Sequence, residues 1–224
     1  MSQTVSAQRL AGLSDAAAQG VARATLDGSA VLLGRSSNLL RILSAHTPYL
    51  ARWFIGFVAA VRQPTVGAVS DVRLRNIATI KTSMVNECTY CTTHTSIYGE
   101  ALGLTRAQVE AMHGDGYKTS ALFDEREKAV IAWAEAVTRN TAKGEPALWA
   151  TMKRLFSDAE IVEITLASAM FNMINRLNDT FRTELETEEY NRRQGKAVKG
   201  VTLDDIETFA GAFAASGNAQ RARG

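Results

Sequence analysis

The sequence predicts an all-α protein, and three observations support that prediction. Only three prolines occur in 224 residues, so few positions would interrupt a helix. The sequence contains no long runs in which apolar and polar residues alternate, as half-buried strands require. Residues that favour helix N-termini recur just before segments whose apolar residues are spaced three and four apart. Together these features indicate helices packed around an apolar core.

The expected helices of the N-terminal part begin at recognisable caps. Residues 1–30 contain a helix with a loose lead-in. Thr47 and Pro48 form an N-cap followed by proline at the first helical position, and this helix should end near Arg62. Ser70 opens the next helix, whose apolar residues continue at helical spacing.

The next expected helix, over residues 87–102, has Asn86 as its N-cap and Gly103 as the residue that ends it. A last helix is expected over 202–215. Between these two segments, helix starts are indicated at Thr105–Gln108, Asp124–Glu127, Glu145–Pro146 and Ser157–Glu160.

Two of the expected helices resemble each other. The segments "SDVRLRNIATIKTSMVN" (70–86) and "SDAEIVEITLASAMFN" (157–172) both begin with Ser-Asp and both end with Met, an apolar residue and Asn. Chance similarity and common origin are both open as explanations. Common origin would predict two related helical units packed around one core.

Composition and charge narrow the range of partners. The chain is 46% hydrophobic and 21% charged, with a net charge of +2, so no basic face for a nucleic acid is indicated. The longest apolar run, over 53–61, falls far short of the roughly 20 residues that span a bilayer. The N-terminus has no signal-peptide pattern. We therefore expect a cytoplasmic protein without a membrane or nucleic-acid partner, whose tryptophans, Trp53, Trp133 and Trp149, lie in the core.

The stretch "NECTYCTTHT" (86–95) holds both cysteines of the chain. On a helix over 87–102, Cys88 would lie in the first turn, where unpaired backbone N–H groups and the helix dipole stabilise a thiolate. Cys91 would share its face and could form a disulfide with it. In a reducing compartment such a pair is more often catalytic or metal-binding than a structural crosslink.

Three further side chains lie on the same stripe of that expected helix. His94 is three residues after Cys91 and could accept its thiol proton, as a base paired with a nucleophile does. Glu87 and Tyr98 fall on the same side at 100° per residue. A dithiol with an imidazole, a carboxylate and a phenol suits peroxide reduction, in which one thiol forms a sulfenic acid and the other resolves it.

Other interpretations of the cysteine pair remain open. The two thiols could be inert residues of the core. A zinc site would use Cys88, Cys91 and His94, but a closed structural site needs a second ligand pair, and only the isolated His46 and His113 remain. No metal is therefore predicted. A c-type haem is excluded, because Thr92 stands where that motif requires histidine.

The segment "DVRLRNIATIKTSMVNECTYCTTHTSIYGEALGLT" (71–105) resembles the carboxymuconolactone decarboxylase superfamily, in its alkylhydroperoxidase D-like branch. Supporting similarity extends over about residues 38–185. The resemblance implies an all-α fold of two related helical units and an assembly as a homotrimer or homohexamer, with no metal or organic cofactor. It places the family domain at 31–190, after the lead-in and before a partly flexible extension over 191–224.

The resemblance also implies separate roles for the two cysteines. Cys91 would attack the peroxide and Cys88 would resolve the intermediate, although helix geometry alone favours Cys88 as the thiolate. The family's proton relay is altered, because Asn76 stands where a glutamate is typical and Thr95 where a histidine is typical. His94, one residue earlier, remains the candidate relay.

These features predict a thiol-dependent peroxidase that reduces a hydroperoxide and is recycled by an external dithiol. Glu87 and Glu163 are candidates for the missing acid of the relay. Two alternatives stay open: a lactone decarboxylase-like or other proton-transfer enzyme on the same scaffold, and a non-catalytic redox sensor or binding protein.

Overall fold

The structure is a computed structural model that describes residues 7–64, 67–197, 201–202, 204–209 and 211. All regular secondary structure in these ranges is helical, which confirms the predicted all-α class. The chain divides into two compact units, Met1–Val66 with Leu177–Gly224, and Gly67–Arg176. The end of the helix expected over 202–215, like most of the extension over 191–224 beyond 197, lies outside the described residues.

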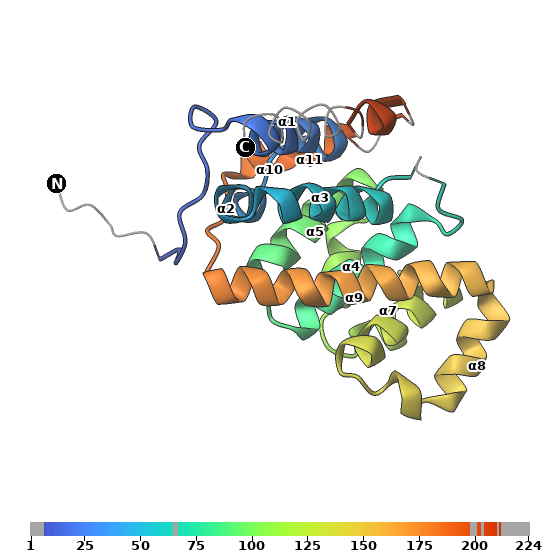
Figure 1. Cartoon of the computed structure of the whole chain (residues 1–224). Coiled ribbons are helices and arrows are strands. Elements are labelled where there is room, and N and C mark those ends of the chain that lie inside the picture. Colours follow the sequence, from blue (N-terminus) through green and yellow to red (C-terminus); the bar gives the residue numbers. More distant parts are fainter. Residues whose placement is uncertain (1–6, 65–66, 198–200, 203, 210, 212–224) are drawn as a thin grey trace. The chain divides into compact units, whose positions relative to one another are not determined.

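In the first unit, three helices pack against one another (Figure 1). They are α1 (Gly20–Leu33), α2 (Asn38–His46) and α3 (Pro48–Arg62). The helix expected from Thr47 to Arg62 is confirmed as α3, with proline at its first position. The unit also contains the short helices α10 (Glu188–Arg192) and α11 (Gln194–Ala197).

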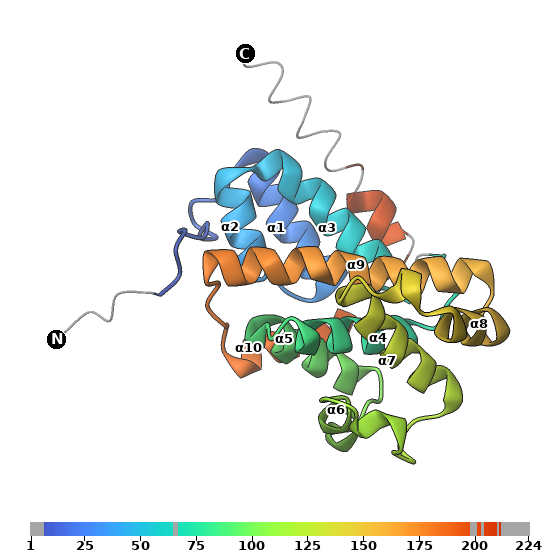
Figure 2. The same cartoon turned by 90° about the horizontal axis from the view of Figure 1, so that it is seen from below.

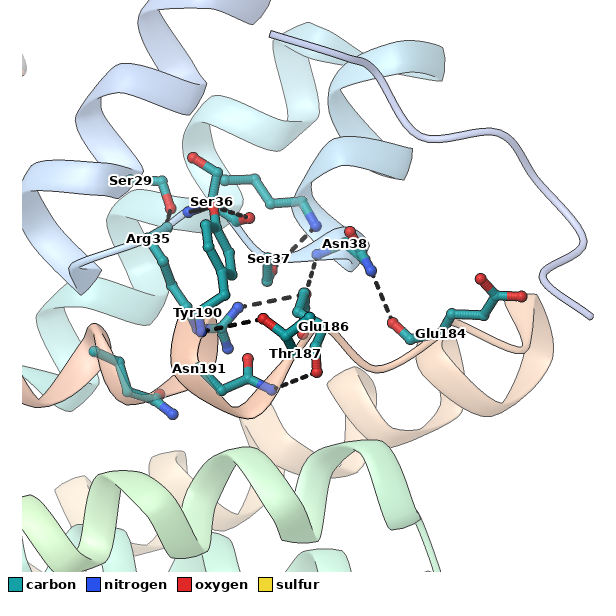
Figure 3. A network of polar contacts seen from close by, with 12 residues as sticks. Ser29, Arg35, Ser36, Ser37, Asn38, Glu184, Glu186, Thr187, Tyr190 and Asn191 are labelled. Carbon is teal, nitrogen blue, oxygen red and sulfur yellow. Dashed lines mark hydrogen bonds and ion pairs between the residues drawn. The ribbon is translucent and has the colours of Figure 1, made fainter. Parts of the chain in front are cut away.

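A polar network ties the segment around α10 to the loop between α1 and α2 (Figure 3). Arg35 forms an ion pair with Glu186 at 3.4 Å, and both side chains are buried. The hydroxyl of Tyr190 donates to the carbonyl of Ser36 at 3.0 Å and accepts from the N–H of the same residue at 3.1 Å. Glu186 also accepts from the backbone N–H of Asn38, and this bond offsets part of the cost of burying its charge.

The second unit contains the cysteines. Its helices, drawn in Figures 1 and 2, are α4 (Val72–Val85), α5 (Thr89–Ala101), α6 (Arg106–Ala111), α7 (Glu125–Thr138), α8 (Pro146–Leu155) and residues 158–176 of α9 (Asp158–Phe181). Helix α4 packs against both α5 and α7. The core of this unit includes Ile77 and Ile80 of α4, Ile131 of α7 and Ile164 of α9, which are fully buried.

Local signals in the sequence explain where most of these helices begin. Capping boxes are present at Thr105 and Asp124, as predicted. The start of α9 has the same reciprocal bonds, since the N–H of Ser157 donates to the carboxylate of Glu160, whose own N–H donates to the hydroxyl of Ser157. Each such pair satisfies two backbone donors that a helix start would otherwise leave unpaired.

The start of the cysteine helix differs from the prediction. Asn86 is the C-cap of α4 rather than the N-cap of α5, because its N–H donates to the carbonyl of Thr82 and continues α4. Glu87 takes a left-handed conformation with φ 56°, and the N-cap of α5 is Cys88. The expected helix over 87–102 therefore starts two residues late. The predicted end of this helix is close to the observed one, since Gly103 directly follows the C-cap and has φ 85°.

The two similar segments contact each other at equivalent positions. Thr82 and Ser168 lie four residues before the closing asparagine of their segments, and their hydroxyl oxygens are 2.8 Å apart. The closing asparagines, Asn86 and Asn172, also form a hydrogen bond, at 2.9 Å. These contacts between equivalent residues support a relationship between α4 and α9.

Candidate active site

The two cysteines face each other at the N-terminus of α5. Cys88 is the N-cap residue and Cys91 is the third residue of the helix. Their sulfurs lie 2.7 Å apart. Both are free cysteines, 0% and 1% exposed respectively. The two side chains are thus close enough to form a disulfide with each other.

Contacts with α4 and α9 hold Cys88 in this position. Its backbone N–H donates to the carbonyl of Ser83 at 3.0 Å, and its sulfur lies 4.0 Å from the carbonyl oxygen of Asn175. Glu87 lies in the connection between α4 and α5 and has a left-handed conformation, a region of φ that residues other than glycine seldom adopt. This residue turns the chain sharply, so that Cys88 returns against the end of α4.

The corrected helix start changes the electrostatic argument for the two thiols. Cys91, rather than Cys88, lies in the first turn of α5. The unpaired N–H groups at a helix start favour negative charge nearby. Cys88 at the N-cap and Cys91 in the first turn both lie near these N–H groups, so helix geometry does not distinguish the two thiols.

His94 contacts Tyr90, one of the two residues between the cysteines in the sequence. Its ring packs edge-on against the ring of Tyr90, with centroids 4.1 Å apart, and its side chain is 5% exposed. Residues four apart stack on one face of a helix, so His94 lies one turn along from Tyr90. By the same spacing, Thr95 lies one turn along from Cys91, and its hydroxyl donates to the Cys91 carbonyl at 2.9 Å.

The two positions where the relay departs from the family contact each other. The side-chain amide of Asn76 donates to the carbonyl of Thr95 at 3.2 Å. A Cβ on Gly99 would lie 2.8 Å from the same amide nitrogen, so the glycine leaves room for the Asn76 side chain in this position. Asn76 and Thr95 are therefore together, but neither side chain can act as a general base.

The other predicted side chains lie apart from this pair. Glu87 precedes α5 and is exposed, which corrects the expectation that it shares the helix stripe. Tyr98 is on α5 and is 2% exposed. Burial lowers the pKa of the Arg75 guanidinium, against the opposing charge of Glu163.

Glu163 has a different role from the proposed relay acid. Its carboxylate accepts from the N–H groups of Val69 (2.9 Å) and Ser70 (2.7 Å), just before α4. Arg75 lies 3.9 Å away. Burial alone would raise the pKa of Glu163, but the hydrogen bonds from Ser70 and Val69 and the charge of Arg75 hold it below its ordinary value. This carboxylate anchors the start of α4.

Replacing Glu163 with glutamine should lower the free energy of unfolding by about 1–2 kcal/mol at pH 7, because charge-assisted hydrogen bonds become neutral ones. A depressed pKa stabilises the fold above the ordinary value of 4.5 and loses that contribution as the pH falls through the folded-state pKa. The difference between the two proteins should therefore shrink at pH 3–4, as urea unfolding at each pH would measure. A constant difference would contradict this role.

A cluster of asparagines beside Cys88 was not predicted as part of the site. The amide of Asn86 donates to the side chains of Asn172 (2.9 Å) and Asn175 (3.0 Å). The amide of Asn175 donates in turn to the hydroxyl of Ser83 at 3.2 Å. The shared asparagine that closes both similar segments was the one signal in the sequence that pointed to this cluster.

The described residues contain no group of three or more His, Cys, Asp or Glu side chains that could hold a metal ion. None of the helices in the described ranges has the length and apolar character needed to cross a membrane.

Comparison with known proteins places the fold. No family model matches the sequence, and no curated protein is significantly similar to it. A protein of unknown function from Agrobacterium tumefaciens, named for antioxidant defence (AhpD), is 25% identical, with 65% of this chain and 96% of that one covered and a TM-score of 0.58. An AhpD core, a peroxidase-related protein from Ralstonia eutropha, is 18% identical, with 84% and 98% covered and a TM-score of 0.68.

A third similar structure has a different chemistry. The debrominase Bmp8 in complex with 2,3,4-tribromopyrrole is 20% identical, with 92% of this chain and all of that one covered, and a TM-score of 0.68. This chain has the helical fold of alkylhydroperoxidase D-like, peroxidase-related proteins, as its resemblance to that branch implied. Enzymes of more than one kind use this scaffold.

Proposed function

We propose that this protein is a thiol-dependent peroxidase that works through a dithiol–disulfide cycle between Cys88 and Cys91. The observation that carries the proposal is the pair of cysteines at the start of α5, with the two sulfurs 2.7 Å apart. The likeness to peroxidase-related structures supports it. The cysteine pair and the fold thus support the same redox chemistry.

The cycle has two chemical steps and a recycling step. The Cys91 thiolate attacks the terminal oxygen of a hydroperoxide, the O–O bond breaks, and a proton goes to the departing alkoxide, which leaves as an alcohol. The Cys88 thiol then attacks the sulfenic acid of Cys91, which releases water and forms the disulfide. An external dithiol reduces the disulfide and is itself oxidised.

His94 is the proposed acceptor of the Cys91 thiol proton. It is the imidazole on the cysteine helix, and Tyr90 fixes its ring. The neutral side chains of Asn76 and Thr95 would provide polar groups near Cys91, but they would not donate or accept its proton. The cytoplasm as the location and a homotrimer or homohexamer as the assembly remain proposals that rest on the family resemblance.

The proposal is tested by oxidation and turnover in one assay. One equivalent of hydrogen peroxide should remove both titratable thiols and lower the protein mass by about 2 Da as the disulfide forms. With excess dithiothreitol, many equivalents of peroxide should then be consumed per protein chain, above the rate of dithiothreitol alone.

Three other outcomes would overturn the proposal. Disulfide formation without turnover would identify a redox sensor. Thiols that survive peroxide would point to proton-transfer chemistry of the lactone decarboxylase kind. Bromide release from 2,3,4-tribromopyrrole, with peroxide left untouched, would indicate a dehalogenase.

A further inference from the structure

The outer face of α3 is apolar along its whole length. All five of its exposed positions are apolar or aromatic, and they are Tyr49, Leu50, Trp53, Phe57 and Ala60. The four large side chains are 40–63% exposed. The prediction that every tryptophan lies in the core was therefore wrong for Trp53, and it was also wrong for Trp149, whereas Trp133 is buried. A continuous apolar face of this kind is typical of a surface that contacts another molecule.

The composition of this face is that of a protein interface. The guanidinium of Arg52 lies 5.2 Å from the ring centroid of Trp53 and 5.9 Å from that of Tyr49. Tryptophan, tyrosine and arginine are the residues that most often carry binding energy between proteins. Apart from the partly exposed Arg52, the face has no charged residue that would select a nucleic acid or a charged peptide.

The spacing of the exposed residues matches a seam between two helices. Leu50, Trp53, Phe57 and Ala60 follow one another at intervals of three, four and three residues. This is the repeat that places side chains in line along a helix pair. A large side chain offers about 150–250 Å² when exposed, so the exposed fractions on α3 correspond to roughly 350–550 Å² per copy.

We propose that α3 is a homotypic interface, in which the α3 helices of two copies pair across a twofold axis. Two such faces would bury roughly 700–1,100 Å² at the centre of the contact, most of the 1,200 Å² at which specific interfaces begin. In an isologous pair the same patch serves both partners, so a second copy supplies a seam with the required spacing. The interface provides an even-numbered assembly, such as a dimer or a hexamer made of two trimers.

The test measures the mass of the assembly by sedimentation velocity over a range of protein concentrations. Trp53→Glu and, separately, Phe57→Glu place a charge in the seam and should weaken association by at least about 30-fold. The mass of the assembly should then fall to half. Both positions are exposed, so circular dichroism should show unchanged helix content.

Leu122→Glu is the matched control, because Leu122 is 47% exposed and lies in the second unit. It should leave the mass unchanged. A monomeric wild type, variants that keep the wild-type mass, or a fall to one third of that mass would each overturn the twofold pairing. So would binding of the wild type, but not of Trp53→Glu, to phosphatidylcholine–phosphatidylglycerol vesicles with no change in mass.

Discussion

Replacing Cys91 with serine should reduce peroxide turnover by about 10³-fold or more. A serine hydroxyl is not ionised near neutral pH and cannot form a sulfenic acid, so the attack on oxygen is lost. The substitution changes little else, because serine fits the buried position at the start of α5. Peroxide consumption with excess dithiothreitol measures the effect, and Thr89→Ser, at an exposed position of the same helix, is the control.

Cys88→Ser should separate the two cysteine roles. Turnover should slow after the first chemical step, because Cys91 can still attack peroxide but its sulfenic acid must then be reduced by the external dithiol. The product should be a sulfenic acid on Cys91, seen as a mass gain of about 16 Da and trapped by dimedone. A sulfenic acid that forms on Cys88 in the Cys91→Ser protein would reverse the assignment. Full turnover in either variant would contradict a dithiol cycle.

Most helix starts could be predicted because their signals are local. The capping boxes at Thr105 and Asp124 involve residues three apart, so the sequence alone contains both partners. Asn86 could not be assigned in the same way, because asparagine is compatible with either end of a helix. The left-handed Glu87 was also hidden, since glutamate seldom adopts that conformation.

The surroundings of the dithiol depend on contacts between residues that are distant in the sequence, and these contacts could not be predicted from the sequence. The pairing of Cys88 within one turn of Cys91 follows from the motif itself. The contact of Asn76 with Thr95 requires α4 to pack on α5, which Gly99 allows. Nothing in the motif indicates that an asparagine 87 residues after Cys88 would place its carbonyl beside the thiol.

Replacing that asparagine, Asn175, should have a large effect on the free energy of unfolding. Asn175 is 0% exposed, and its side chain joins Asn86 to Ser83. Asn175→Ala would leave both partners short of a hydrogen bond and open a small cavity. We expect the free energy of unfolding to fall by about 2–4 kcal/mol. Urea unfolding measures this loss, and Met173→Ala, exposed on the same helix, should change it by less than about 0.5 kcal/mol.

Asn175→Ala should also affect the resolving step more than the attack on peroxide. Ser83, whose carbonyl holds the N–H of Cys88, would lose the hydrogen bond that its hydroxyl accepts from Asn175. Cys88 should then be held less firmly against Cys91, while the position of Cys91 within α5 is unchanged. More sulfenic acid should therefore be trapped by dimedone before the disulfide forms. Equal slowing of both steps, in protein that is still folded, would show that the asparagine cluster supports the whole helix start rather than Cys88.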